Sequence, residues 1–331
     1  MSFRVHVTRP IPEAGLEQLR AAGFAVTVPS ELGTPSRAQL LEACESVDGI
    51  VSLLTEKIDA ELFERAPRLK VVCNMAVGYD NVEMAEATRR GILVCNTPGV
   101  LTETTADFTW ALMLAVARRV VEGHALVTEG KFDAWGPLML LGHDLYGQAL
   151  GIVGMGRIGR AVARRAVGFG MRVVFASSSS TPEEIALGLG TVARRVGLEQ
   201  LLAESDYVSL HTPLTPATYH LIDASALARM KPTAFLINTS RGPVVDEQAL
   251  VEALRAGRLA GAGLDVFERE PQVHPALFGL PGVVLAPHAA SASVATRNRM
   301  ATMATGQMVD VLSGRRPPHP VNPQVWPGPK N

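Results

Sequence analysis

Short apolar, β-branched segments alternate with segments of helical periodicity along almost the whole chain. The first series predicts strands at residues 4–7, 25–28, 50–53, 69–74 and 92–95, with helices between them at 14–22, 36–43, 60–65 and 84–89. Strands that alternate with helices are typical of parallel sheets covered by helices on both faces. We therefore expect an α/β domain in this first part of the chain.

A second series of the same kind follows a long amphipathic helix predicted at residues 102–123. Its strands are predicted at residues 149–153, 172–176, 207–210, 234–238, 261–266 and 283–286. The last helix, predicted at 294–312, has no strand after it, so that it either closes the second domain or crosses back to the first. A length of 331 residues also favours two domains over one.

A glycine-rich turn, GMGRIG at residues 154–159, joins the first strand of the second series to a helical pattern. A dinucleotide-binding fingerprint requires this strand–turn–helix context. Gly154 permits the tight turn, Gly156 lets the backbone approach a pyrophosphate, and Gly159 allows close packing of the helix on the strand. The start of the helix offers unpaired N–H groups to the phosphates. The pattern therefore favours a bound dinucleotide over a purely structural turn.

The end of the next strand bears on which dinucleotide binds. NAD-binding sites place an acid about 20 residues further on, where it holds the ribose 2′-hydroxyl. Here serines occupy residues 177–180, and no acid follows before Glu183. Small hydroxyls accommodate a 2′-phosphate, so that NADP(H) is favoured over NAD(H). The arginine expected beside such a phosphate is missing from this loop, and Arg157, Arg194 and Arg195 are the remaining cations.

Reactive side chains follow three successive strands of the second series. Arg241 follows the fourth strand, Glu268 or Glu270 the fifth, and His288 the sixth. Each side chain alone is more often solvated or packed than catalytic. Ligands in open α/β sheets bind at the carboxyl ends of the strands, so that the joint arrival of the three types at one edge indicates an active site.

This set fits the reduction of a 2-oxo acid by hydride transfer from a nicotinamide. A protonated His288 would supply the proton, and a neighbouring carboxylate would favour the charged imidazolium. Arg241 would grip the substrate carboxylate with its planar fork and stabilise the negative charge that develops on the ketone oxygen.

These segments together resemble the D-isomer-specific 2-hydroxyacid dehydrogenases. The resemblance rests on residues 154–159, 238–242, 264–271 and 286–288, on the substrate-loop-like AVGYDN at 76–81, and on the hinge-like TPGVL at 97–101. It extends over nearly the whole chain. Residues 135–142 and the serine-rich loop are most similar to glyoxylate/hydroxypyruvate reductases.

The resemblance implies two Rossmann-like or flavodoxin-like α/β domains with parallel sheets and the active site in the cleft between them. The substrate-binding domain would comprise residues 1–100 and 289–331, and the dinucleotide-binding domain residues 101–288. The last predicted helix would then cross back to the first domain. The resemblance also implies a homodimer that acts on glyoxylate, hydroxypyruvate or a related small 2-oxo or 2-hydroxy acid.

The resemblance assigns residues to this site. Arg241, Glu270 and His288 are the expected catalytic residues, and Glu270 is preferred to Glu268 because it precedes the family's proline, Pro271. Backbone N–H groups around Val77 and Gly78 would bind the substrate carboxylate, and Leu53 and Arg241 complete the expected substrate-binding set. The expected cofactor-binding residues are Thr105, Gly154, Met155, Gly156, Arg157, Ile158, Gly159, Ser177, Ser178, Ser179, His211, Thr212, Pro213, Thr239, Ser240, Asp265, His288 and Ala290.

The chain departs from the family pattern at Ala290, where the family usually has glycine near the nicotinamide carboxamide. Two alternatives stay open. One is another dehydrogenase of the family, acting on phosphoglycerate or phosphite. The other is a nucleotide-sensing, corepressor-like binding protein, although the intact set of Arg, Glu and His favours an enzyme. A formate dehydrogenase is disfavoured, because that relative pairs its histidine with an amide.

Composition excludes several other classes. With 31 Lys and Arg against 32 Asp and Glu, the net charge of −1 indicates neither a nucleic-acid-binding surface nor a polybasic membrane patch. Cys44, Cys73 and Cys95 lack metal-ligand spacing, so that no metal site is predicted. The chain shows no secretory segment and no apolar run of membrane length, and we expect a cytoplasmic enzyme.

Overall fold

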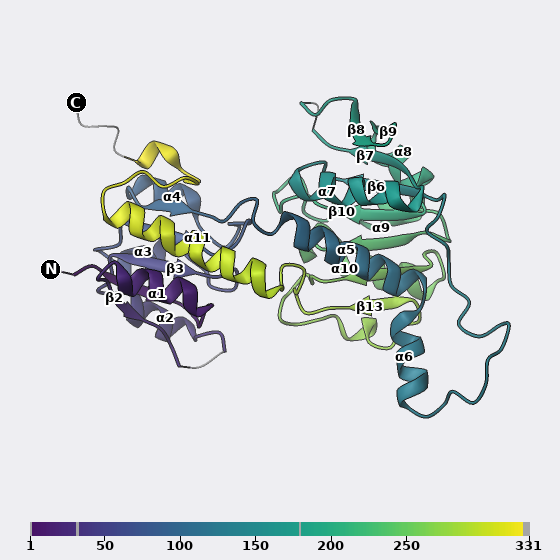
Figure 1. Cartoon of the computed structure of the whole chain (residues 1–331), viewed down its shortest axis with the longest axis horizontal. Coiled ribbons are helices and arrows are strands. Elements are labelled where there is room, and N and C mark those ends of the chain that lie inside the picture. Colours follow the sequence, from purple (N-terminus) through teal and green to yellow (C-terminus); the bar gives the residue numbers. More distant parts are fainter. Residues whose placement is uncertain (1, 31–32, 179, 327–331) are drawn as a thin grey trace. The chain divides into compact units, whose positions relative to one another are not determined.

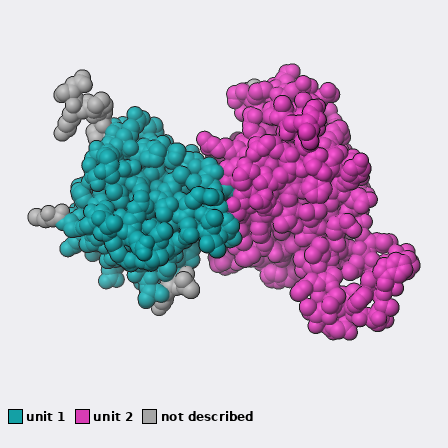
Figure 2. Space-filling model, viewed as in Figure 1, with its two compact units in different colours: residues 1–101, 292–331 teal, residues 102–291 magenta. Residues whose placement is uncertain are grey.

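The structure, a computed structural model, describes residues 2–30, 33–178 and 180–326. The chain divides into two compact units, each drawn in its own colour in Figure 2. Unit 1 comprises residues 1–101 and 292–331, and unit 2 comprises residues 102–291. These limits differ by a few residues from the domain boundaries expected from the sequence. Unit 1 is therefore built from both ends of the chain, whereas unit 2 is one continuous segment.

Unit 1 contains a five-stranded parallel sheet with the strand order β2-β1-β3-β4-β5. This is the flavodoxin-like order, in which the chain reverses its direction across the sheet between β1 and β3. The strands are β1 (Arg4–Val7), β2 (Ala25–Thr27), β3 (Gly49–Ser52), β4 (Val71–Asn74) and β5 (Leu93–Cys95). The connecting helices are α1 (Glu13–Ala21), α2 (Arg37–Cys44), α3 (Ala60–Arg65) and α4 (Met84–Arg89).

The last helix, α11 (Val294–Leu312), also belongs to unit 1 and lies against α1 (Figure 1). A Cβ added at Gly15 of α1 would lie only 3.0 Å from the Cβ of Ala301, so that the two helices approach closely. Thr305 Oγ1 donates a hydrogen bond to Gln18 Oε1 at 2.8 Å. The helix therefore crosses back to the first part of the chain, which the strand pattern alone left open.

After α11 the chain runs beside β5 as a strap. The Val321 N–H donates to the Val94 carbonyl at 2.7 Å, and Asn322 Oδ1 accepts the Val94 N–H at 2.8 Å. A 3₁₀ turn, Pro323–Val325, follows.

Unit 2 contains an eight-stranded sheet with the order β13-β12-β11-β10-β6-β7-β9-β8. The run β9-β7-β6-β10-β11-β12 has the order 3-2-1-4-5-6 of a Rossmann sheet, with its reversal between β6 and β10. The strands are β6 (Ala149–Val153), β7 (Arg172–Ala176), β8 (Glu184–Gly188), β9 (Thr191–Arg195), β10 (Tyr207–Leu210), β11 (Phe235–Asn238), β12 (Gly261–Leu264) and β13 (Val283–Leu285).

The α-helices of unit 2 are α5 (Thr102–Ala117), α6 (Val120–Thr128), α7 (Arg157–Ala166), α8 (Leu198–Glu204), α9 (Ala224–Arg229) and α10 (Glu247–Arg255), with 3₁₀ turns at Val167–Phe169, Gly242–Val244 and Pro275–Leu277. Helix α5 connects two parts of this unit. Trp110 stacks on Phe169 with ring centroids 4.5 Å apart and donates its Nε1–H to the Val162 carbonyl of α7 at 3.1 Å. Thr109 and Thr239 pair through their hydroxyls at 2.9 Å, which ties α5 to the end of β11. Among the described residues, no helix combines the length and the apolar character needed to cross a membrane.

Two parts of unit 2 differ from the prediction. The single helix expected at residues 102–123 is wrong, because Arg119 adopts a left-handed φ of 53° and separates α5 from α6. The Ala117 carbonyl accepts the His143 N–H at 2.9 Å. Strands β8 and β9 were not expected, and they pair antiparallel, so that this sheet is not wholly parallel. Gly188 and Gly190, both at positive φ, make the reversal between them.

Candidate active site

The three predicted catalytic side chains follow neighbouring strands of unit 2. Arg241 follows β11, Glu270 follows β12 and His288 follows β13, and these strands are adjacent in the sheet. Because the strands are parallel, their carboxyl ends meet at the same edge.

His288 and Glu270 contact each other directly. His288 Nδ1 lies 2.8 Å from Glu270 Oε2, and Glu270 Oε1 accepts the Phe267 N–H at 3.1 Å. Burial opposes ionisation of Glu270, but the hydrogen bond and the charge of His288 outweigh it and hold the pKa of this carboxyl below its ordinary value. The contact occupies Nδ1 and leaves Nε2 of the ring for another partner.

Asp265 holds the turn that carries His288. Its carbonyl accepts the His288 N–H at 2.7 Å, and its two carboxylate oxygens accept the N–H groups of Ala289 at 2.7 Å and Ala290 at 2.8 Å. Burial raises the pKa of Asp265, although both N–H groups favour its ionised form. His288 itself has a φ of 54°, a conformation that residues other than glycine rarely adopt and that persists only where the surroundings enforce it.

The loop of Arg241 is held from within by Asn238. The Asn238 amide donates to the Arg241 carbonyl at 2.9 Å, and its oxygen accepts the Ser240 N–H and hydroxyl at 3.0 and 2.8 Å. At Gly242 a Cβ would lie 1.8 Å from the Phe267 carbonyl oxygen. A glycine is therefore needed for the Arg241 loop to approach the loop that carries Glu270.

Glu268, the alternative acid, has different partners. Its Oε2 accepts the Glu247 N–H at 3.3 Å, and its Oε1 lies 3.3 Å from His220 Nε2. In return, the Glu247 carboxylate accepts the N–H groups of Glu268 and His274, each at 2.8 Å. Glu268 and Glu247 thus clamp the loop after β12 to the start of α10, and only Glu270 of the two candidate acids contacts His288.

The glycine turn has the geometry that its spacing predicts. Gly154 has a φ of 96°, and a Cβ there would lie 2.6 Å from the His211 carbonyl oxygen. A Cβ at Gly159 would lie 2.1 Å from the Gly154 oxygen, so that helix α7 packs directly on the turn. A Cβ at Gly156 would meet nothing within 4 Å. This open side, at the start of a ten-residue helix, fits a pyrophosphate.

A side chain beside the glycine turn also fits a bound pyrophosphate. Thr212 Oγ1 is buried and has no hydrogen-bond partner among the residues that the structure describes. Its neighbour His211 contacts Ser209 Oγ at 2.8 Å, and burial lowers the pKa of His211 to about 3. His211 is therefore uncharged at neutral pH. Of the other predicted cofactor-binding residues, Thr105, Met155, Thr239 and Ala290 are buried, Ile158 and Ser240 are half-buried, and Arg157 and Pro213 are exposed.

The serine loop after β7 lies next to a cation. Arg195 ends β9 opposite Phe175 of β7, and its Nη1 donates to the Ser178 carbonyl at 3.4 Å. Its ion pair with Glu183 is longer, at 3.8 Å. Ser177 Oγ accepts a hydrogen bond from Thr181, whereas Ser179 lies outside the described residues.

In unit 1, the predicted substrate loop follows β4. The Ala76 carbonyl accepts the Thr97 N–H at 2.8 Å, and the Val77 carbonyl accepts the Asn96 amide at 2.8 Å. Because C=O and N–H point in opposite directions in a trans peptide, these bonds also fix the Val77 and Gly78 N–H groups. Within the described part of the chain, neither N–H has an acceptor.

The sequence analysis missed a group of polar side chains beside Leu53. Glu56, Asn74 and Asn81 form hydrogen bonds with the loops after β3 and β4. The position of Glu56, shortly after the third predicted strand, is a signal of the same kind as those of Arg241, Glu270 and His288. The asparagines gave no comparable signal.

Comparisons with known proteins identify the family. The family described as D-isomer specific 2-hydroxyacid dehydrogenase, NAD binding domain, matches residues 110–290. A glyoxylate reductase of Korarchaeum cryptofilum is 55% identical over 328 residues, which cover 98% of this chain and 97% of that protein.

Solved structures give the same result. A protein of Thermus thermophilus has a TM-score of 0.89 and 50% identity, and the match covers 96% of this chain and 99% of that one. An NADPH-dependent glyoxylate/hydroxypyruvate reductase of Sinorhizobium meliloti, solved with NADP and malonate, has a TM-score of 0.84 and 34% identity over 98% of each chain. The chain therefore belongs to the D-isomer-specific 2-hydroxyacid dehydrogenases, and it is an oxidoreductase that acts on oxo acids with a nicotinamide cofactor.

Proposed function

We propose that the protein reduces glyoxylate and hydroxypyruvate to the corresponding 2-hydroxy acids. The observation that carries the proposal is the contact between His288 and Glu270. It lies at the carboxyl ends of the parallel strands β11, β12 and β13, and Arg241 follows the first of these strands. The names of the relatives, glyoxylate reductase and glyoxylate/hydroxypyruvate reductase, support this choice of substrate. The nicotinamide cofactor, when bound, supplies the hydride.

His288 is the proposed proton donor. Because Glu270 engages Nδ1, the proton that reaches the ketone oxygen comes from Nε2. The carboxylate keeps the ring in one orientation, with Nε2 available for the transfer. Asp265 supports the same arrangement by holding the backbone of His288 and of the two residues after it.

Arg241 and the loop after β4 are the proposed anion-binding groups. Arg241 would stabilise the carboxylate and the developing negative charge of the substrate. The N–H groups of Val77 and Gly78 are suited to a carboxylate, because their directions are fixed and no protein acceptor in the described residues satisfies them. Leu53 would contribute apolar contact. Accordingly, unit 1 is the proposed substrate-binding domain and unit 2 the dinucleotide-binding domain.

We further propose that NADP(H) is favoured over NAD(H). The loop after β7 offers serine hydroxyls and no acid, and Arg195 supplies a cation beside Ser178 that the sequence could not place. Arg195 would thus replace the arginine that the loop itself lacks. The NADP bound to the Sinorhizobium meliloti reductase supports the choice by analogy.

A homodimer is the proposed assembly. Helix α6 has no buried residue, and the segment after it projects from unit 2 (Figure 1). Trp135, Leu138 and Leu141 of this segment are 78, 81 and 62% exposed. Exposed apolar surface of this kind marks an interaction site. A second copy suits it, because residues 132–142 hold a single charged side chain.

Initial rates with glyoxylate, hydroxypyruvate and pyruvate, each with NADPH and NADH, test the proposal. We expect the highest kcat/KM with glyoxylate or hydroxypyruvate and NADPH. Nucleotide binding without turnover of any of the three acids would contradict the proposed function and favour a nucleotide-sensing role.

A further inference from the structure

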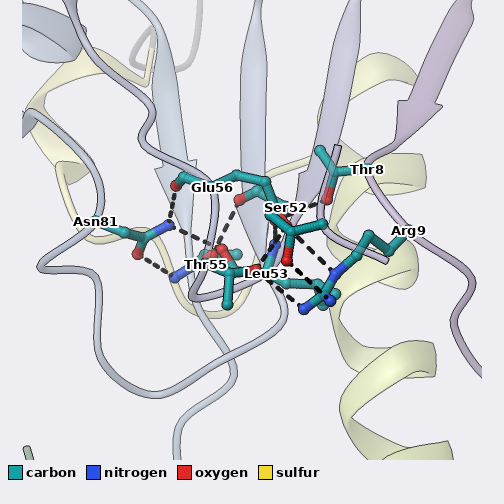
Figure 3. Close-up of polar contacts among 9 residues, drawn as sticks. Thr8, Arg9, Ser52, Leu53, Thr55, Glu56 and Asn81 are labelled. Atoms are coloured by element: carbon teal, nitrogen blue, oxygen red, sulfur yellow. Dashed lines mark hydrogen bonds and ion pairs between the residues drawn. The ribbon is translucent and has the colours of Figure 1, made fainter. Parts of the chain in front are cut away.

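A network of polar side chains joins the two loops of unit 1 that follow β3 and β4 (Figure 3). Asn81, at the end of the second loop, reaches back to the first. Its Nδ2 donates to the Leu53 carbonyl at 2.9 Å and to the Glu56 carbonyl at 3.0 Å. One amide group therefore holds both ends of the turn after β3.

The same asparagine is held from the strand below. Asn74, fully buried at the end of β4, donates its Nδ2 to Asn81 Oδ1 at 3.1 Å and to the Gly78 carbonyl at 2.8 Å. Asn74 Oδ1 accepts the Ser52 hydroxyl at 2.9 Å. The Asn74–Asn81 pair thus links the peptide of Gly78, in the proposed carboxylate loop, to the peptide of Leu53.

Glu56 fixes the other side of Leu53. Its Oε2 accepts the Leu53 N–H at 2.7 Å and the Thr8 hydroxyl at 2.8 Å, while its Oε1 accepts the Thr55 hydroxyl at 2.7 Å. Arg9 Nε faces this carboxylate at 3.4 Å. The cluster lies where the chain direction reverses between β1 and β3, the place at which sheets of this order bind ligands. Here the Glu56 carboxylate accepts the hydrogen bonds of the Leu53 N–H and of the Thr8 and Thr55 hydroxyls.

We propose that Asn81 is a positioning residue for the 2-oxo acid, because it sets Leu53 relative to the Val77–Gly78 amides through hydrogen bonds to both loops. The inference rests on the proposed function. Both the N–H and the C=O of Leu53 are held by side chains, and so is the Gly78 carbonyl. Loss of Asn81 would free one loop to shift against the other, and a displacement of about 1 Å costs up to 10²-fold in rate.

The test uses the full chain with Asn81→Ala and Asn81→Leu. Leucine has a side chain of similar shape to asparagine but cannot form hydrogen bonds. Asn322→Ala is the matched control, because Asn322 is a buried asparagine of the same unit that binds Val94, Thr88 and Ile92 and touches neither loop. We expect both Asn81 variants to lose about 10- to 100-fold in kcat/KM for glyoxylate, mostly through KM. KM for NADPH should change less than twofold. Asn322→Ala should lower the Tm without changing KM for glyoxylate.

Hydrogen exchange gives a readout that needs no turnover. We expect faster exchange of backbone amides in residues 53–56 and 76–81 of the Asn81 variants, and no such change in Asn322→Ala. Kinetic losses no larger than those of Asn322→Ala, or an equal rise in KM for NADPH, would overturn the inference. If the wild type turned over no 2-oxo acid, the proposed function would fail and the substrate role of Asn81 with it. The exchange data would still report whether Asn81 couples the two loops.

Discussion

His288 and Glu270 lie eighteen residues apart in the chain, yet their side chains meet at 2.8 Å. The meeting depends on residues that do no chemistry. Asp265 fixes the backbone around His288 at an unfavourable φ, and the Phe267 N–H fixes one oxygen of Glu270. The pair is therefore oriented before any substrate binds, as the proposed role of His288 as proton donor requires.

Replacing His288 with Asn should reduce kcat by about 10² to 10⁴-fold, the range of general acid catalysis, because an amide cannot donate the proton. The affinity for NADPH, measured by quenching of protein fluorescence, should stay within about threefold. Equal turnover by the variant would remove His288 from the role of proton donor.

The pKa of Glu270 gives a prediction on stability. Because the folded-state pKa is lowered, ionised Glu270 stabilises the fold above the ordinary glutamate pKa of about 4.3, and this stabilisation is lost as the pH falls through the folded value. Glu270→Gln should thus have a lower free energy of unfolding than the wild type in urea at pH 7, and the gap should narrow below about pH 4. Glu17→Gln, an exposed acid on α1, controls for the loss of one charge. A gap independent of pH would contradict the electrostatic explanation.

At the scale of elements, two glycines of the β6–turn–α7 unit differ in what a larger side chain would contact. Gly159 is required by the protein itself, since a Cβ would overlap the Gly154 oxygen. Gly156 faces open space, so that the fold itself does not require its small size, which we attribute to the proposed approach of the cofactor.

Gly156→Ala should therefore keep its Tm within about 2 °C of the wild type while KM for NADPH rises tenfold or more. Gly159→Ala should lower the Tm, because helix α7 must move off the turn, and overpacking of this kind typically costs about 1–3 kcal/mol. Thermal melts and initial rates separate the two. Similar melting losses in both variants would show that Gly156 is also structural.

The pairing of β9 with β7 positions Arg195 beside the serine loop, where we propose that it recognises the 2′-phosphate of NADP(H). Arg195→Ala should raise KM for NADPH about tenfold and leave KM for NADH unchanged, because only the former carries a 2′-phosphate. Arg194→Ala is the control from the same strand, since Arg194 is 71% exposed and pairs with Glu184 at 3.2 Å. An equal rise for both cofactors would argue against phosphate recognition by Arg195.

The sequence predicts some features of the elements and not others. Strand and helix order follow from periodicity, because both sheets are buried and their strands are continuous apolar runs. The glycine roles follow from spacing. The break at Arg119 depends on one left-handed residue, which periodicity does not report. The Asn74–Asn81 network depends on hydrogen bonds between loops, and the position of Arg195 depends on the pairing of β9 with β7, so that neither could be assigned before the fold was known.

At the scale of the whole molecule, the segment after α6 exposes large apolar side chains that a single copy of the chain does not bury. Trp135 and Leu138 are each more than three-quarters exposed. Light scattering after size exclusion should give the mass of a dimer for the wild type and of a monomer for Leu138→Asp, because a buried unpaired charge costs several kcal/mol. Asp133→Ala, in the same segment, should not dissociate the dimer. A wild-type monomer would refute the proposed assembly.

The position of α11 has a consequence for synthesis. The helix packs on α1, β3 and β4, but it is synthesised only after the whole of unit 2. The roughly 190 residues of unit 2 are made in between, which takes about 10 to 40 s at ordinary rates of translation. Domains of a nascent chain generally fold in order from the N-terminus. Here the sequence of unit 2 is complete before α11 is made, so that unit 1 can complete its fold only after unit 2 has been synthesised.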